Sequence, residues 1–359
     1  MVLPLPVISW ALKSPVRFWN MLRLNGNFRR ATKKKETCMR TEHLQVPLFL
    51  IISPTASCNL SCFGCYNKSY PRNEEISPAV FDRLIRESKE LGTFFYVIAG
   101  GEPLLRKDLF DVFSKHKDVV FMLFTNGTLI NEGHARMLSK LHNVATMFSV
   151  EGFLQETDKR RGEGVYEKVL RAMQVLGGQN LFYGFSTTVT NENINVVAGD
   201  EFYREMIKFG CRLGIYVEYI PSREGADRVL SDQERAGLRN KILQWRTEKK
   251  AFLFHLPRDE HELAGRCLSA GNGFLHVTSR GYIEPCPFVH FAAENINEKS
   301  FKDILRSPFL AALRERESMF SEGETGCGLF DNISEVKDIA GKHNAVNTLQ
   351  CVSCSDGKN

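Results

Sequence analysis

Three cysteines near residue 60 are the side chains of this chain best suited to chemistry. Cys58, Cys62 and Cys65 are spaced C-x3-C-x2-C, directly after the apolar run at 48–52. Three thiolates can hold three irons of a [4Fe–4S] cube, which leaves the fourth iron open to a small molecule. Structural zinc is the alternative, but zinc sites close with four ligands, and neither this window nor the next two residues supply a fourth. The spacing therefore favours a cluster with an open iron.

A glycine-rich stretch follows the cysteine motif. Gly100 and Gly101 precede Glu102 and Pro103, just after an apolar run of strand length. Two glycines allow the backbone to approach a ligand closely. The Glu102 carboxylate and the neighbouring carbonyls are acceptors suited to an ammonium group. A lone Gly-Gly pair is more often a turn, but its place behind the cysteines favours a binding site.

Together, the C-x3-C-x2-C-Y motif and the GGEP stretch resemble the radical S-adenosylmethionine (radical SAM) family. In that family the amino and carboxylate groups of S-adenosylmethionine chelate the open iron. One electron then cleaves the sulfonium to a 5′-deoxyadenosyl radical, which abstracts a hydrogen atom from the substrate. The resemblance implies that Tyr66 lies against the adenine. It also implies that Gly100, Gly101, Glu102 and Pro103 bind the methionine amino group.

The resemblance extends along the next strands. A Thr-Asn-Gly sequence after the third predicted strand contains Asn126, and a Ser-Val-Glu-Gly sequence after the fourth contains Ser149 and Glu151. The resemblance implies that these residues contact the cofactor, with Ser149 and Glu151 at the ribose or the methionine. Residues 158–162 resemble an Asp-x-x-Arg-Gly element of the family. By that resemblance Arg161 faces the methionine carboxylate, and its neighbour Arg160 is solvated.

Strands and helices alternate from about residue 46 to 222. Apolar runs of strand length occur at 47–53, 94–99, 119–124, 144–150, 182–189 and 214–220. Helical stretches lie between them, and Ser77-Pro78 is typical of a helix start. Six strand–helix repeats predict a parallel sheet. The fold class is therefore α/β, and the resemblance makes it a partial (β/α)6 TIM-like barrel. Each motif lies just past the C-terminal end of a strand, where barrels of this kind carry their catalytic residues.

The last quarter of the chain holds five of the ten cysteines. Such clustering suits metal binding better than a disulfide framework. Residues 274–284 alternate like a hairpin with Arg280-Gly281 at the turn, and a helix is expected over 300–314. The run Cys267-x13-Gly281-x4-Cys286 resembles the opening half of a SPASM or twitch extension, a small α+β region that carries auxiliary iron–sulfur clusters.

The full SPASM pattern needs seven cysteines, and this chain offers five. One auxiliary [4Fe–4S] cluster is therefore expected rather than two. Cys267, Cys286 and Cys327 are the expected ligands, and Cys351 or Cys354 is the expected fourth. The alternative is that these last two cysteines lie on a frayed tail.

An N-terminal arm carries most of the charge imbalance. Residues 1–45 hold nine basic and two acidic groups, a net +7, and the rest of the chain is −2. A helix is expected after Ser14-Pro15, with apolar and basic residues on opposite faces. A helix with one apolar and one basic face suits a membrane surface, and the basic stretch 29–35 would attract anionic lipid. An arm packed outside the barrel remains the alternative. The apolar stretch at 2–12 is far shorter than the roughly 20 residues that span a bilayer.

These features predict four regions: a basic arm (1–45), the barrel (46–225), a helical connection (226–265) and a cysteine-containing extension (266–359). The expected function is a radical SAM enzyme acting on an unknown substrate, such as a lipid or isoprenoid. A peptide or protein substrate is the alternative, and a non-catalytic iron–sulfur electron carrier is an alternative of another class. An electron donor such as flavodoxin or ferredoxin is an expected partner, and nucleic acid is not. The expected location is the cytoplasm, at the inner face of the membrane if the arm binds lipid.

Overall fold

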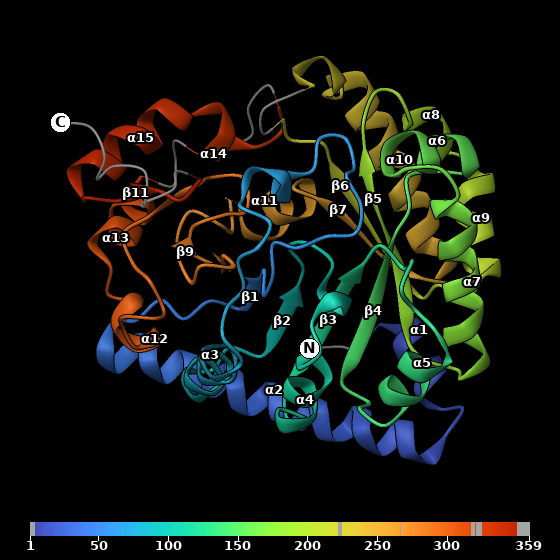
Figure 1. The fold of residues 1–359 in the computed structure, drawn as a ribbon, viewed down its shortest axis with the longest axis horizontal. Helices are drawn as coiled ribbons and strands as arrows, with labels where there is room; N and C mark the ends of the chain where they lie inside the picture. The colour runs from blue at the N-terminus through green and yellow to red at the C-terminus, as the bar shows by residue number, and fades with distance from the viewer. Residues whose placement is uncertain (1–3, 222–224, 266, 317–319, 321–324, 350–359) are drawn as a thin grey trace.

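A curled sheet forms the centre of the structure, which is a computed structural model that describes residues 4–349 apart from 222–224, 266, 317–319 and 321–324. The strand order is β7-β6-β5-β4-β3-β2-β1-β8-β9 (Figure 1). Strands β1 to β8 are parallel to their neighbours, and β9 returns antiparallel to β8. The strands are β1 (Phe49–Ile52), β2 (Phe95–Ile98), β3 (Val120–Thr125), β4 (Val144–Ser149), β5 (Tyr183–Val189), β6 (Leu213–Glu218), β7 (Phe252–Leu256), β8 (Phe274–Val277) and β9 (Ile283–Glu284), with β10 (Phe291–Ala292) and β11 (Val346–Asn347) paired separately.

Helices cover the outer face of the curved sheet (Figure 1). The N-terminal and barrel helices are α1 (Leu5–Ala11), α2 (Pro15–Glu42), α3 (Pro78–Leu91), α4 (Leu109–Lys115), α5 (Glu132–Ser139), α6 (Leu154–Arg161), α7 (Val165–Gly178), α8 (Ile194–Val197) and α9 (Asp200–Lys208). The later helices are α10 (Asp232–Glu248), α11 (Arg258–Ala264), α12 (Phe301–Ile304), α13 (Pro308–Glu315), α14 (Gly328–Asp331) and α15 (Ile333–Lys342). Short 3-10 helices are η1 (Tyr66–Ser69), η2 (Pro103–Leu105) and η3 (Ala226–Arg228).

Local sequence signals explain where several elements begin. The Ser77 hydroxyl accepts a hydrogen bond from the Val80 amide, and Pro78 occupies the first turn of α3. Ser231 and Glu234 form a capping box at the start of α10. Burial alternates along β3, because one set of side chains packs against the helices while the other faces the inside of the curve. The inner face is also apolar, and its side chains come from Met122, Phe124, Met147, Phe182, Leu213, Ile215, Val217, Phe254 and Leu256.

The six predicted barrel strands are present as β1 to β6, and the curled parallel sheet confirms the predicted fold class. The connection over 226–265 was expected to be helical, and this is wrong for its middle part. Residues Phe252–Leu256 form β7, which pairs with β6 and extends the sheet. The run Phe-Leu-Phe-His-Leu is short and rich in β-formers, so it adds to the sheet edge once α10 has ended at Glu248.

The C-terminal extension joins the barrel directly. The predicted hairpin is present as β8 and β9, and β8 pairs in parallel with β1. Gly281 at the turn has φ +84°, a conformation that glycine adopts without strain. The single helix predicted over 300–314 is wrong. It is divided into α12 and α13, because Pro308 cannot continue a helix from the preceding turn but can start a new one.

The N-terminal region folds as two helices along one end of the barrel (Figure 1). The predicted helix start at Pro15 is confirmed, and α2 continues to Glu42. Phe28 on α2 packs against Phe94 and Phe95 at the start of β2, with ring centroids 5.4 and 5.7 Å away. The Trp10 indole on α1 donates to the carbonyl of Asn180, shortly before β5. Both helices therefore lie at the N-terminal ends of the strands.

Among the described residues, every helix is too short or too polar to cross a bilayer.

Candidate functional site

The chemistry-bearing motifs gather at the C-terminal ends of neighbouring strands. The cysteine loop follows β1, the glycine-rich stretch follows β2, and Asn126 follows β3. Ser149 ends β4, and Glu151 lies two residues beyond it. Because these strands are adjacent and parallel, the motifs share one rim of the sheet, as predicted.

Gly100 and Gly101 bring the glycine-rich stretch against the cysteine loop. The Gly101 amide donates to the Thr55 carbonyl at 2.9 Å, and the Glu102 amide donates to the Ser57 carbonyl at 2.8 Å. A Cβ atom at Gly101 would lie 2.0 Å from the Ser57 oxygen, and one at Gly100 would lie 2.7 Å from the Ser53 side chain. The glycines are therefore required by the close packing of two loops, and not only by a ligand.

The three thiols of Cys58, Cys62 and Cys65 are partly buried and free. Burial raises the pKa of Cys58, and the nearby Glu102, Cys62 and Cys65 raise it further. In the part of the chain that the structure describes, no three His, Cys, Asp or Glu side chains converge on one ion. A [4Fe–4S] cube takes its thiolates at separate irons, so its ligands need not meet at a point. The donor set of three neighbouring thiols fits such a cube.

The Glu102 carboxylate is bonded within the protein. It is buried and accepts hydrogen bonds from the Leu104 amide (3.1 Å), the Thr125 hydroxyl (2.8 Å) and the Asn126 amide (2.8 Å). The carboxylate therefore ties the loop after β2 to the end of β3. Within the described residues, nothing donates to the carbonyls of Gly100 and Gly101, so these oxygens are the acceptors left for an ammonium group. Pro103 is buried and starts η2.

The Glu151 carboxylate is also bound within the protein. It pairs with Arg160 and with Arg161, whose Nε lies 2.8 Å from Oε1, and it accepts from the Thr188 amide at 2.8 Å. Burial alone would raise the pKa of Glu151, but the two arginines hold it below the ordinary value. The expectation of a solvated Arg160 is wrong, because its guanidinium pairs with the buried Glu151 carboxylate and is largely shielded from water.

One positive charge remains in this triad after the carboxylate is neutralised. Burial alone would lower the pKa of Arg161, yet Glu151 and the nearby Cys62 and Cys65 raise it. The Arg161 guanidinium therefore lies beside the cysteine loop, and the amide of Phe63 is anchored to the carbonyl of Arg160 at 3.0 Å.

Tyr66 and Asn126 each bond to a neighbouring loop. The Tyr66 hydroxyl accepts from the Gly100 amide at 3.1 Å, and burial raises its pKa to about 12. Asn126 Nδ2 donates to Asn59 in the cysteine loop at 2.8 Å. Ser149 lies opposite Ser186 of β5 and is partly exposed, so it remains available to a ligand.

The auxiliary cysteines Cys267, Cys286 and Cys327 are all buried and lie near one another. Burial is the largest cause that raises the pKa of Cys267 to about 11 and that of Cys327 to about 12. Glu260 adds to the shift of Cys267, and the neighbouring Cys267 thiol adds to that of Cys327. A metal stabilises the thiolate form that burial disfavours, so this trio fits a cluster. Cys351 and Cys354 lie outside the described residues.

Several buried polar residues near the site were missed by sequence reasoning. Burial raises the pKa of Glu260 to about 7, and its carboxylate lies close to Cys267. A chain of hydrogen bonds also links the hairpin to the barrel: Ser53 Oγ to His276 Nε2 (2.8 Å), His276 Nδ1 to Glu284 (2.7 Å), and Tyr70 to Glu284 (2.8 Å). The strand alternation that pairs His276 with Glu284 was the available signal.

Glu218, at the end of β6, is 3 % exposed and pairs with Arg235 at 2.7 Å. His255 on β7 lies 2.9 Å from the same carboxylate. Glu218 therefore joins three elements of the barrel.

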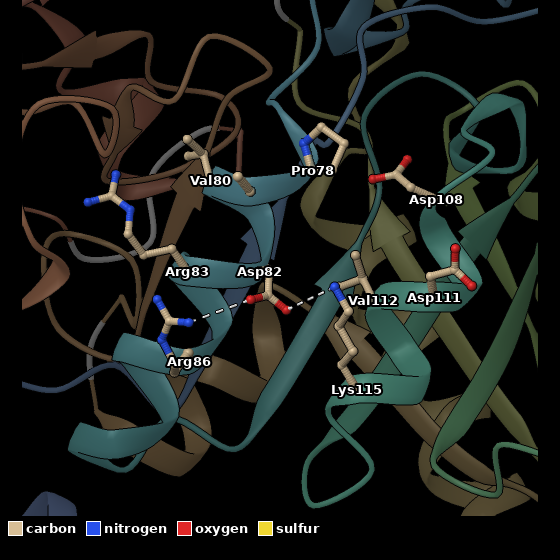
Figure 2. A pocket seen from close by; sticks show the side chains of 10 residues that line it. Pro78, Val80, Asp82, Arg83, Arg86, Asp108, Asp111, Val112 and Lys115 are labelled. Carbon is tan, nitrogen blue, oxygen red and sulfur yellow. Dashed lines mark ion pairs between the residues drawn. The ribbon is translucent and has the colours of Figure 1, made fainter.

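One hollow on the surface lies away from these residues. It lies between α3 and α4, and charged side chains of both signs line it, including Asp82, Arg86 and Lys115 (Figure 2). Asp82 pairs with both cations, at 3.7 and 3.9 Å. The hollow is thus a solvated groove between two helices.

Comparison with known proteins agrees with this geometry. Residues 52–198 match the radical SAM superfamily, and residues 267–327 match the SPASM iron–sulfur cluster-binding domain. The chain therefore contains a radical SAM domain followed by a SPASM domain. It is an enzyme that uses a [4Fe–4S] cluster and S-adenosylmethionine, and its SPASM-type extension carries auxiliary iron–sulfur chemistry. The non-catalytic electron carrier considered from the sequence is therefore excluded.

Curated relatives cover most of this radical SAM enzyme. Mycofactocin maturase MftC of Mycobacterium tuberculosis is 28 % identical over 309 residues, which are 80 % of this chain and 78 % of that protein. AdoMet-dependent heme synthase of Methanosarcina barkeri is 26 % identical over 287 residues, which are 70 % of this chain and 79 % of that protein.

Solved structures share the fold. SuiB of Streptococcus suis, bound to precursor peptide SuiA, superposes with a TM-score of 0.66 at 17 % identity, covering 83 % of this chain and 73 % of that one. A structure of anSMEcpe with bound AdoMet and a peptide gives 0.60 at 21 % identity, covering 76 % and 83 %.

Proposed function

We propose that this chain is a radical SAM enzyme that modifies a peptide. The observation that carries the proposal is the match to MftC, a maturase, which continues through both the barrel and the extension. The bound peptides in SuiB and anSMEcpe support it at the level of the fold. The lipid or isoprenoid substrate expected from the basic arm has no support among these proteins. The heme synthase match makes a tetrapyrrole the second candidate substrate.

The site suggests a role for each of its residues. Cys58, Cys62 and Cys65 would hold the core cluster, which supplies reductive cleavage of S-adenosylmethionine when bound. The free carbonyls of Gly100 and Gly101 would accept from the methionine ammonium group.

On the other side of the cysteine loop, the excess positive charge at Arg161 would pair with the methionine carboxylate. Tyr66 would fix the position of Gly100 and lie beside the adenine. Ser149, which is partly exposed at the end of β4, would contact the ribose. Asn126, Glu102 and Glu151 would act indirectly, because each is already bound to a neighbouring loop or strand.

In the extension, Cys267, Cys286 and Cys327 would hold one auxiliary cluster. Cys354 remains the proposed fourth ligand. The buried trio lies in the region that follows β7 and packs on β1 through β8. Such a cluster would relay electrons to or from the core site, or bind the substrate.

The enzyme assignment can be tested with cluster-reconstituted protein under anaerobic conditions. Dithionite and S-adenosylmethionine should yield 5′-deoxyadenosine. Cys62→Ala should abolish this product, while Cys38→Ala, which changes a thiol packed between α2 and α3, should retain it. Activity in the Cys62→Ala protein would contradict the assignment.

The substrate class can be tested separately by mass spectrometry. The enzyme would be incubated with peptides encoded by short reading frames beside its gene, and in parallel with iron coproporphyrin. A change in peptide mass that requires S-adenosylmethionine would support the proposal. A change in the tetrapyrrole alone would replace it with the second candidate.

A further inference from the structure

The solvent-facing side of the two N-terminal helices exposes large apolar residues. Of the three tryptophans, Trp245 is buried, Trp10 is bonded to the Asn180 carbonyl, and Trp19 is 68 % exposed. Leu12 and Val16 are 64 % and 54 % exposed. We call this set the apolar end of the helical pair, and its members are Leu5, Leu12, Val16, Trp19 and Leu22.

A basic stripe continues the same side of α2. Its members are Arg23, Arg29, Arg30, Lys33 and Lys34, all exposed, and they follow Val16 and Trp19 at helical spacing. Residues 1–35 contain eight Lys and Arg and no Asp or Glu. Within the described part of the chain, none of these eight cations forms an ion pair with a carboxylate. The stripe therefore presents unneutralised positive charge.

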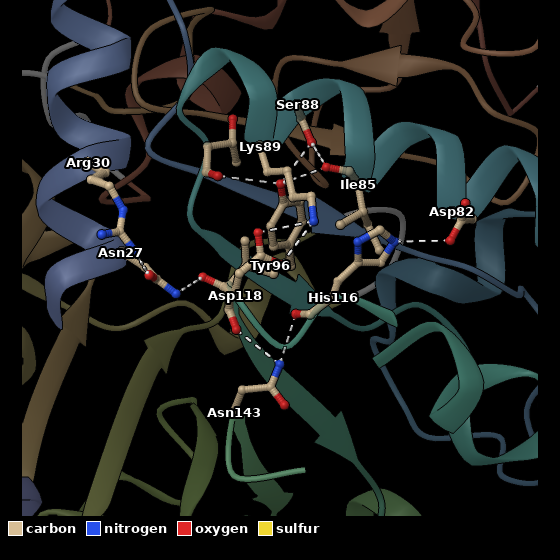
Figure 3. Close-up of polar contacts among 12 residues, drawn as sticks. Asn27, Arg30, Asp82, Ile85, Ser88, Lys89, Tyr96, His116, Asp118 and Asn143 are labelled. Atoms are coloured by element: carbon tan, nitrogen blue, oxygen red, sulfur yellow. Dashed lines mark hydrogen bonds and ion pairs between the residues drawn. The ribbon is translucent and has the colours of Figure 1, made fainter. Parts of the chain in front are cut away.

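The opposite side of α2 is fixed to the barrel. Asn27 donates to the Asp118 carbonyl at 2.9 Å, just before β3, and Lys89 pairs with the Asp118 carboxylate (Figure 3). Ala31 is buried, and a Cβ atom at Gly92 would lie 2.5 Å from its carbonyl oxygen. The exposed side is thus held in a set orientation. It covers the end of the barrel opposite the rim that carries the cysteine loop.

We propose that the apolar end and the basic stripe form a docking surface for an anionic lipid bilayer. The apolar side chains would enter the interface, and the cations would lie at headgroup level, as in amphipathic helices parallel to a membrane. An acidic protein such as an electron donor fits less well, because it would dock at the far end from the clusters. In the docked orientation the catalytic rim faces the solvent. This inference does not depend on the identity of the substrate.

The test uses the full chain and co-sedimentation with vesicles. One set contains equal parts of phosphatidylglycerol and phosphatidylcholine, and the other contains phosphatidylcholine alone. We expect sedimentation with the first set, weakened by salt, and little with the second. Lys33→Gln/Lys34→Gln should weaken binding about 30-fold. Val16→Ser/Trp19→Ser should weaken it at least about 10-fold.

Matched changes elsewhere provide the controls. Lys337→Gln/Lys342→Gln removes two exposed cations of α15 in the extension, and Met137→Ser/Leu243→Ser removes two apolar side chains that are 41 % and 44 % exposed. Both control proteins should bind like the unchanged chain. All variants should keep its melting temperature and its formation of 5′-deoxyadenosine, because the changed residues are exposed and remote from the rim.

Two results would overturn the proposal. The first is equal sedimentation of the arm variants and their controls, or none with anionic vesicles. The second is that soluble polyglutamate displaces the protein from anionic vesicles while Val16→Ser/Trp19→Ser binds these vesicles as well as the unchanged chain does. That outcome would mean that the surface recognises acidic protein rather than lipid.

Discussion

Most polar side chains of the site hold the backbone in place. Glu102 bonds to donors from η2 and from the end of β3, and Glu151 bonds to Arg160, Arg161 and β5. Both carboxylates are buried and bonded mainly within the protein. We therefore expect S-adenosylmethionine to be bound by the groups that these residues position. These groups are the carbonyls of the glycine-rich stretch and the surplus positive charge at Arg161.

Tyr66 tests whether the position of Gly100 matters for the cofactor. In Tyr66→Phe the Gly100 amide loses its acceptor, and a hydrogen bond of this kind contributes about 1 kcal/mol. We expect binding of S-adenosylmethionine to weaken about 5-fold, with iron content unchanged. Calorimetry on the reconstituted protein measures this. Tyr216→Phe is the control, because that buried hydroxyl has no partner within the described residues and its loss should be neutral. Equal affinities of the two variants would contradict the role of Tyr66.

Arg161 and Arg160 share a carboxylate but should differ in function. Arg161 lies near Cys62 and Cys65, so its charge is placed for an anionic ligand. Arg161→Gln should weaken S-adenosylmethionine binding about 30-fold, equivalent to about 2 kcal/mol for a hydrogen bond to a charged group. Arg160→Gln should lower the unfolding free energy about as much as Arg161→Gln does, because Glu151 loses one arginine in either variant. It should change the affinity for S-adenosylmethionine little. Equal losses of affinity in the two variants would mean that the triad acts only as a structural unit.

The strands and their order could be predicted because their signals are local. Apolar runs and helix caps lie within a few residues, and the placement of motifs after strands follows from parallel pairing. The partners of Glu102 and Arg160 could not be predicted in this way. They depend on which backbone amides and carboxylates neighbouring strands bring together, and those contacts join residues 23 and 9 positions apart.

Short elements were missed for a related reason. Strand β7 has five residues, and its run of apolar residues does not distinguish a strand from a buried helical turn. The network of His276, Glu284 and Tyr70 required both the register of the hairpin and its docking on β1. The break before Pro308 was visible in the sequence, and an interior proline should have ended the predicted helix there.

The stability contributed by the contacts among α10, β7 and α11 is expected to depend on pH. Burial alone would raise the pKa of Asp259, but Arg246, the His255 amide and Arg239 hold it below the ordinary value. The ionised group thus favours the folded state above about pH 4, and this stabilisation is lost as pH falls through the lower folded pKa.

Asp259→Asn should therefore lower the unfolding free energy by about 2 kcal/mol at pH 7, because Arg246 loses its carboxylate partner and the buried Arg239 keeps only Glu262. The difference from the unchanged chain should shrink below about pH 4. Urea unfolding over a pH series measures both effects. Asp111→Asn, at an exposed position of α4, should show neither. A pH-independent difference would exclude the charge of Asp259 as the cause.

Considered as one body, the protein has two different ends. The strand C-termini carry the cysteine loop and border the extension, whereas the strand N-termini are covered by α1 and α2 (Figure 1). The N-terminal region was open to two interpretations from sequence, as a membrane-binding arm or as a packed arm. The structure shows that one side of α2 packs against the barrel while the other side is exposed. The helix can therefore be packed and still offer a surface for docking.

Removing residues 1–45 should therefore destabilise the barrel itself. Phe94 is 4 % exposed beneath Phe28, so truncation would expose it to water together with part of the strand ends. Phe28→Ala should lower the unfolding free energy by about 2 kcal/mol, roughly half the cost at a fully buried phenylalanine. Trp19→Ala, on the exposed side of the same helix, should leave it unchanged. Urea unfolding of the three proteins measures the difference. If truncation and Phe28→Ala left stability intact, α2 would not be an integral part of the barrel, and the fixed orientation on which membrane docking depends would be lost.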